Sequence, residues 1–171
     1  IGTSEGYPQV RSVTVEEGSF FTSAQLTSRA KVAVLGPTTR DDLFGEGANA
    51  VGSKIRINNL EFTVIGVTKS KGGSGFGNAD DRIFVPLTTS LQYISGGVYV
   101  SSIAVTTENQ EDLTQLQSDI TNLLLEQHNK KTPEEADFSI FNQADLASTA
   151  QSITKVFTIL LSSVASISLI V

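Results

Sequence analysis

The sequence predicts an α+β protein with a β-rich subdomain, a small strand–helix–strand subdomain and a long C-terminal helix that enters a membrane. Three observations favour this class. Short apolar runs separated by turn residues fill residues 1–97. A strand, an amphipathic helix and a second strand are indicated in residues 98–142. Residues 143–171 then end in an apolar run, Val156–Val171, that contains no charge, proline or glycine.

The β-rich part is expected to begin with short strands and one short helix. The run Lys31–Gly36 is almost continuously apolar, which is typical of a strand buried on both faces. Pro37 suits the first turn of a helix that Gly45 would end. Strands are predicted at Val10–Val15, Lys31–Gly36, Lys54–Asn58, Glu61–Val67 and Arg82–Leu87.

A β-hairpin is the clearest local prediction. Asn58 and Asn59 separate two alternating segments, and asparagine tolerates the left-handed backbone of a two-residue turn. The inward face is expected to comprise Ile55, Ile57, Phe62, Val64 and Val67. A loop with four glycines between Gly72 and Gly77 follows.

The second part is predicted as a strand, a helix and a strand. Strands are expected at Ser102–Thr107 and Phe138–Phe141, and Thr107 with Gln110 resembles a capping box. The helix between them would end near Lys130, Lys131 and Pro133. Its apolar face is expected to comprise Leu113, Leu116, Ile120, Leu123 and Leu124. Asn142 and Asp145 would then begin one continuous helix over Ala144–Val171.

Composition excludes several functions. The chain of 171 residues has a net charge of −6 and a pI near 4.7, which argues against nucleic-acid binding because phosphates require clustered Lys and Arg. Cysteine is absent, which excludes thiolate catalysis, cysteine–zinc sites and disulfides.

No motif reaches the level of a catalytic, cofactor-binding or metal site. His128 is the sole histidine and is interpreted as a solvated residue near a helix end. Residues Gly47–Lys54 approach a phosphate-binding loop, but the last two residues are exchanged and a strand is expected to follow. Asn78, Asp80 and Asp81 do not fit a calcium loop and are interpreted as a loop cap. Ser74 lacks a nucleophile elbow, so no enzyme is predicted.

The apolar run is interpreted as the start of a transmembrane helix, with a buried core helix as the alternative. Thr158, Ser162 and Ser166 recur every fourth residue, and such small residues allow membrane helices to approach closely. Lys155 precedes the run, where its charge can reach the interface. The predicted membrane-spanning residues are Val156, Phe157, Ile159, Leu160, Leu161, Val164, Ile167, Leu169, Ile170 and Val171.

Three segments in order resemble the extracytoplasmic core domain of MacB-type permeases of the FtsX-like group of ABC transporters. They are Glu16–Thr22 (EEGSFFT), Lys31–Val67 and Gly75–Thr89, and the segment after Ser152 resembles that family's second transmembrane helix. The resemblance implies a β-rich subdomain at 1–97, a porter-like α/β half-unit at 98–142 and a stalk helix at 143–171.

The resemblance also implies a function in transport. Such permeases lie in the bacterial cytoplasmic membrane, with this domain facing the periplasm or the cell exterior. They form homodimers or pseudo-dimers and associate with a cytosolic ATPase, fused or separate. A membrane-fusion or accessory protein is a further expected partner, and no cofactor is expected in this domain. ATP hydrolysis would move the stalk and drive export of a peptide, a macrolide-like compound or a lipoprotein. The alternative is a membrane-anchored sensor or adhesion domain without an ATPase partner.

Overall fold

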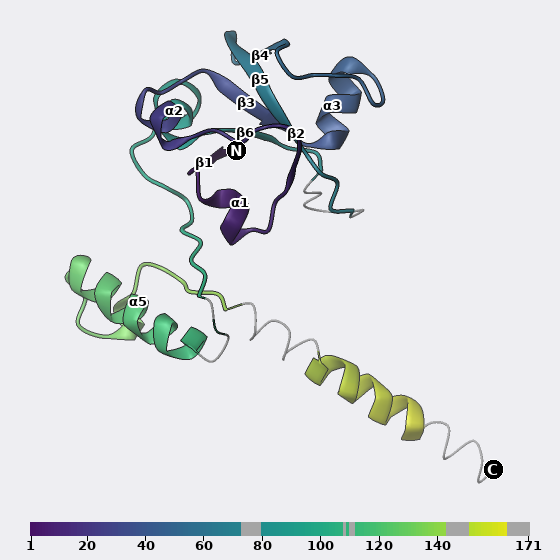
Figure 1. The fold of residues 1–171 in the computed structure, drawn as a ribbon. Coiled ribbons are helices and arrows are strands. Elements are labelled where there is room, and N and C mark those ends of the chain that lie inside the picture. The colour runs from purple at the N-terminus through teal and green to yellow at the C-terminus, as the bar shows by residue number, and fades with distance from the viewer. Residues whose placement is uncertain (73–79, 108, 110–111, 143–150, 164–171) are drawn as a thin grey trace. The chain divides into compact units, whose positions relative to one another are not determined.

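A computed structural model describes residues 1–72, 80–107, 109, 112–142 and 151–163. The chain divides into two compact units, Ile1–Thr106 and Thr107–Val171. The first unit contains the sheet and the second contains the longest described helix (Figure 1). The protein is therefore a mixed α+β protein, as the sequence predicts.

The first unit is built on a mixed six-stranded sheet. Its strands follow the order β1-β6-β3-β5-β2, and β4 pairs with β5 beside that path (Figure 1). The strands are β1 (Gly2–Thr3), β2 (Val15–Gly18), β3 (Val32–Leu35), β4 (Lys54–Ile57), β5 (Leu60–Thr68) and β6 (Ile83–Pro86). The helices of this unit are α1 (Tyr7–Val10), α2 (Ser23–Thr27), α3 (Pro37–Phe44), α4 (Leu87–Ser90) and the π-helix η1 (Leu91–Ser95).

Strand β3 is buried on both faces of the sheet. Val34 packs into a cluster with Phe21 and Phe84, whereas Ala33 and Leu35 point into clusters on the opposite face. Both faces are therefore covered, which explains why this strand reads as a continuous apolar run. Strand β3 is parallel to β5 and antiparallel to β6.

A bulge in β5 decides which side chains share a face. The register with β3 passes from Ala33–Val64 to Val34–Gly66, so that Ile65 is the extra residue. Val67 consequently lies in the same cluster as Val64, although the two are three residues apart, and Ile65 packs on the other face. The predicted inward face of the hairpin is confirmed: Phe62, Val64 and Val67 are fully buried.

The predicted hairpin and short helix are confirmed. Strands β4 and β5 pair antiparallel from Lys54–Thr63 to Ile57–Leu60, and the turn residues Asn58 and Asn59 have φ of 48° and 63°. Helix α3 begins at Pro37 and ends before Gly45, whose φ of 97° favours glycine.

The predicted strand at Val10–Val15 is wrong. Pro8 lies in the first turn of α1, and Val10 ends that helix. Ser12 then has a φ of 50°, and the strand in this region, β2, begins only at Val15 and pairs with β5. Proline favours the backbone conformation of a first helical turn, and this preference outweighs the weak alternation of valines that predicted a strand.

The predicted strands at Ser102–Thr107 and Phe138–Phe141 are also wrong, because neither segment is assigned as a strand. Ile103 is 75% exposed and Phe141 is 81% exposed. A strand forms as part of a sheet, and the described sheet comprises only β1 to β6.

The second unit contains α5 (Leu113–Gln127) and a 3₁₀ turn, η3 (Pro133–Glu135). The predicted helix is confirmed, but its regular part begins at Leu113, and Gln110 of the predicted capping box lies outside the described residues. Leu125 is the buried residue of α5, whereas Leu123, predicted to be on the apolar face, is 57% exposed. After the helix the chain turns, and His128 at the C-cap contacts Asp137.

Candidate functional site

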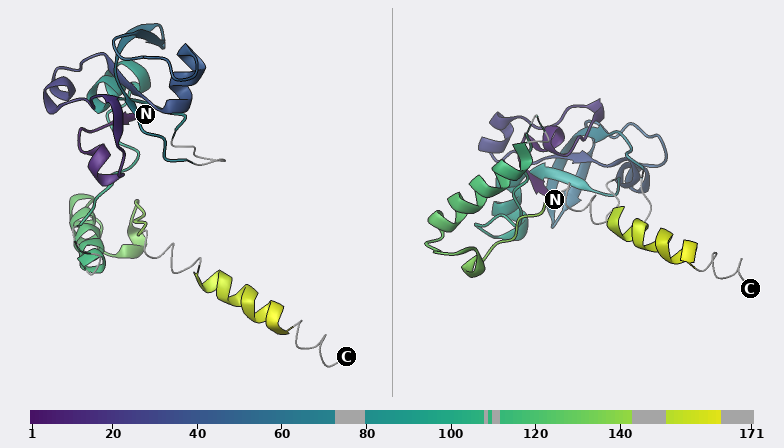
Figure 2. Two further views of the ribbon diagram at one scale, coloured as in Figure 1. Left: turned by 45° about the vertical axis from the view of Figure 1, so that its right-hand side comes forward. Right: turned by 90° about the horizontal axis from the view of Figure 1, so that it is seen from below.

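The C-terminal helical segment leaves all of its large apolar side chains exposed. Residues 151–163 form a helix (Figure 2). Each of these residues is exposed. A helix of a water-soluble domain normally buries its apolar face, and an exposed apolar face is typical of a segment that contacts a partner or lipid. The exposed large apolar residues of the segment are Ile153, Val156, Phe157, Ile159, Leu160 and Leu161.

Two hydroxyl side chains of this segment bond to their own helix. The Oγ1 of Thr158 donates to the carbonyl of Thr154 at 2.9 Å, and the Oγ of Ser163 donates to the carbonyl of Ile159 at 2.8 Å. Such bonds satisfy a hydroxyl without water, which lowers the cost of moving it into an apolar phase.

The predicted membrane-spanning residues fall in two groups. Val156, Phe157, Ile159, Leu160 and Leu161 lie on the described helix and are exposed. The other predicted residues lie outside the described part of the chain: Val164, Ile167, Leu169, Ile170 and Val171. Ala144 and Asp145 of the predicted stalk also lie outside it. Within the described part of the chain, no helix combines the length and the apolar character needed to cross a bilayer.

Asp80 closes the base of the glycine-rich loop. Its buried carboxylate accepts hydrogen bonds from the main-chain N–H groups of Lys71 (2.9 Å) and Gly72 (3.1 Å) and from the hydroxyl of Ser70 (2.6 Å). The N–H of Lys71, followed by the Ser70 hydroxyl, lowers the pKa of Asp80. The interpretation of Asp80 as a loop cap fits this geometry, whereas Asn78 lies outside the described residues.

The same aspartate joins the loop base to α3. Its carbonyl accepts a hydrogen bond from the N–H of Thr38, and a Cβ on Gly36 would approach that carbonyl oxygen to 2.2 Å. Glycine is therefore required at position 36 by close packing of two main-chain segments. The neighbouring Asp81 makes a separate contact with α3, because its carboxylate accepts a hydrogen bond from the hydroxyl of Thr39 at 3.2 Å.

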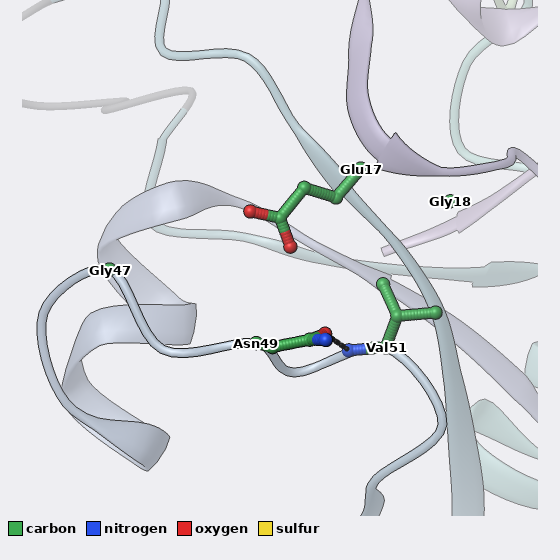
Figure 3. Close-up of a pocket in the computed structure, with 5 residues that line it drawn as sticks. All are labelled: Glu17, Gly18, Gly47, Asn49 and Val51. Atoms are coloured by element: carbon green, nitrogen blue, oxygen red, sulfur yellow. Dashed lines mark hydrogen bonds between the residues drawn. The ribbon is translucent and has the colours of Figure 1, made fainter.

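The near match to a phosphate-binding loop lines an open hollow of about 430 Å³. In Figure 3 the Glu17 side chain points from β2 toward the loop that bears Gly47 and Asn49. Asn49 accepts a hydrogen bond from the N–H of Val51, which closes a turn. Strand β4 follows, as expected, so this loop does not present the helix N-terminus that a phosphate site uses.

An ionic contact beside this hollow was not foreseen from the sequence. Arg40 of α3 lies 2.8 Å from Asp41 and 3.8 Å from Glu17 of β2. The N–H of Gly47, followed by Arg40, lowers the pKa of Asp41. These contacts join α3 and its following loop to the sheet, and no local sequence signal links Glu17 to a residue so distant in the chain.

His128 is bound to one carboxylate. Its Nδ1 lies 2.6 Å from Oδ1 of Asp137, and its ring meets that of Phe138 edge-on. The hydrogen bond with His128 lowers the pKa of Asp137. In the described part of the chain no group of three or more His, Cys, Asp or Glu side chains could hold a metal ion.

Comparison with known proteins gives a consistent result. The model of the MacB-like periplasmic core domain matches residues 1–123. Macrolide export ATP-binding/permease proteins MacB from Bdellovibrio bacteriovorus and Rhodospirillum rubrum are 35% and 36% identical over 100% and 99% of this chain. The chain spans about a quarter of the length of these curated relatives, 26% in both.

Two solved structures share the fold. The periplasmic region of MacB from Actinobacillus actinomycetemcomitans has a TM-score of 0.70 and 24% identity, and covers 88% of this chain and 64% of its own. The extracellular domain of the noncanonic ABC-type transporter YknZ from Gram-positive bacteria has a TM-score of 0.63 and 22% identity, and covers 76% of this chain and 64% of its own.

Proposed function

Because the chain belongs to the family of MacB-like periplasmic core domains, we propose that it links ATP hydrolysis in the cytosol to export across the bacterial cytoplasmic membrane. The relatives are named as joint ATP-binding and permease proteins, and the chain spans 26% of their length. The ATPase is therefore proposed to lie outside this chain, fused to it or separate. The proposed cargo is a peptide, a macrolide-like compound or a lipoprotein.

The observation that supports this proposal best is the exposed apolar surface of residues 151–163. We propose that Val156–Val171 begins a transmembrane helix and that residues 143–171 form the stalk between the bilayer and the outer domain. Lys155 would mark the interface, because its long side chain can hold the charge in water. A sensor or adhesion domain would share this anchor but would not need an ATPase.

The proposed role of the domain is mechanical. The sheet is packed on both faces, and Arg40 and Asp80 join α3 to its neighbours, so the first unit can move as one body. A stalk helix that shifts with the ATPase cycle would then move this body without local unfolding. Residues 1–97 are proposed as the β-rich subdomain and residues 98–142 as a porter-like unit built around α5, without the two strands first expected. The proposed assembly is a homodimer or pseudo-dimer with an accessory protein.

Cross-linking two stalks tests the coupling. The chain contains no cysteine, so Gln151→Cys places a single thiol at the polar start of the described helix, in a full-length protein freed of its other cysteines. Oxidation should join two protomers and abolish export while nucleotide binding persists. Gln9→Cys, at an exposed position of α1, is the matched control and should leave export unchanged. Undiminished export by the cross-linked protein would refute mechanical coupling through the stalk.

A further inference from the structure

Strand β4 has one free side. It pairs with β5 alone among the described strands, and the two strands lie side by side (Figure 1). Ile57 and Leu60 flank a two-residue turn and therefore exchange main-chain hydrogen bonds. Since bonded and non-bonded pairs alternate, the N–H and C=O groups of Lys54 and Arg56 point away from β5.

The main-chain bonds of β5 agree with this assignment. Thr63, which faces Lys54, donates its N–H to the carbonyl of Lys31 on the opposite side. Thr63 and Lys54 are therefore a non-bonded pair, as the turn geometry requires. The outward main-chain groups of Lys54 and Arg56 are called the β4 edge below, and they can accept a further strand.

A small hollow lies directly beside this edge. It has a volume of about 230 Å³ and is lined by Leu43, Phe44, Lys54, Ile55, Arg56 and Ile83. Leu43, in the last turn of α3, is 52% exposed. A strand added to the β4 edge would direct every second side chain toward this hollow, because side chains alternate between faces.

The charged side chains of β4 favour one kind of partner strand over another. Lys54 and Arg56 project from the face opposite to Ile55 and Ile57, which pack into the core. Lys54 is paired with Glu61 at 2.6 Å, and Arg56 faces the same carboxylate in the register of the hairpin. Lys54, Arg56 and Glu61 together carry one net positive charge. A second copy of this chain, paired edge to edge, would bring these cations together, and like charges on facing strands destabilise pairing. A strand with acidic side chains on that face would instead be attracted.

We propose that the β4 edge binds an extended segment of a partner protein in which acidic and apolar residues alternate. The acidic side chains face Arg56 and Lys54, and the apolar side chains enter the hollow beside Leu43 and Ile55. Main-chain hydrogen bonds give an affinity that any extended segment would share. The alternation of acidic and apolar side chains gives the specificity. This inference does not depend on the export function, because it concerns a surface of the folded unit Ile1–Thr106.

Nuclear magnetic resonance of the 171-residue chain in lipid nanodiscs tests the edge with defined probes. A short synthetic peptide that alternates glutamate with valine should shift the amide signals of residues 54–57 and slow hydrogen exchange at Arg56. A peptide that alternates lysine with valine should bind at least tenfold more weakly.

Two variants separate the contributions of backbone and charge. Arg56→Pro removes the outward N–H without removing a bond to β5, and should abolish binding. Arg56→Glu should reverse the preference to the lysine peptide, whereas Lys69→Glu, on another exposed segment, should not. Equal binding of both peptides, shifts confined to other residues, or dimers joined through β4 would overturn the proposal.

Discussion

Asp80 shows how one carboxylate can determine a local structure. It accepts two main-chain N–H groups and one hydroxyl across the base of the glycine-rich loop. Each of these bonds favours the ionised form, so the pKa of Asp80 is lower in the folded than in the unfolded protein. Its contribution to stability is therefore complete above the unfolded pKa of about 3.9 and is lost as the pH falls through the folded value.

We expect Asp80→Asn to destabilise the first unit by about 1–3 kcal/mol near neutral pH, because an amide replaces one accepting oxygen with a donor. The difference in free energy of unfolding between wild type and variant should shrink below about pH 4. Chemical denaturation at several pH values measures both effects. Asp81→Asn is the control, since its amide oxygen can still accept from Thr39. A difference that persists unchanged at acid pH would contradict the assigned role.

At the scale of the element, the β4–β5 hairpin depends on its turn. Asn58 and Asn59 both have positive φ, and together they set the register that directs Lys54 and Arg56 outward. A side chain branched at Cβ is strained in this conformation, whereas glycine is not.

Asn59→Val should therefore lower the free energy of unfolding by about 1–2 kcal/mol. Asn59→Gly should change it by less than about 0.5 kcal/mol, because glycine adopts positive φ without a steric cost. Thermal unfolding followed by circular dichroism distinguishes the two variants. Equal destabilisation by valine and glycine would show that the asparagine side chain, and not its backbone, matters.

At the scale of the whole molecule, charge and apolar surface are unevenly distributed along the chain. Residues 1–106 contain nine basic and nine acidic residues, whereas residues 107–171 contain three and nine, so the net charge of −6 belongs to the second unit. The second unit also includes the exposed apolar helix of residues 151–163. Anionic lipids would repel such a unit, so the membrane insertion proposed for Val156–Val171 depends on apolar burial.

The double variant Phe157→Asp, Leu160→Asp should abolish flotation of the chain with neutral liposomes. A carboxylate costs about 2.5–3.5 kcal/mol at the centre of a membrane helix, and both side chains are exposed in the structure. Gln151→Asp, at the polar start of the same segment, should float like the wild type. If the double variant floats equally well, the segment does not enter the bilayer.

The sequence by itself determined the parts of this protein that depend on local interactions. The buried strand β3, helix α3 with its proline and glycine ends, and the asparagine turn follow from residue type and spacing alone. The apolar character of Val156–Val171 and the resemblance to MacB-type permeases were equally visible in the sequence.

Only the tertiary structure decided how distant segments meet. The bulge at Ile65, the contact of Arg40 with Glu17 and the closeness of Gly36 to Asp80 join residues far apart in the chain. The segments at Ser102–Thr107 and Phe138–Phe141 have the composition of strands, yet they do not form strands. The reason is physical: a strand exists only with a hydrogen-bonded neighbour, and the identity of that neighbour is a property of the fold.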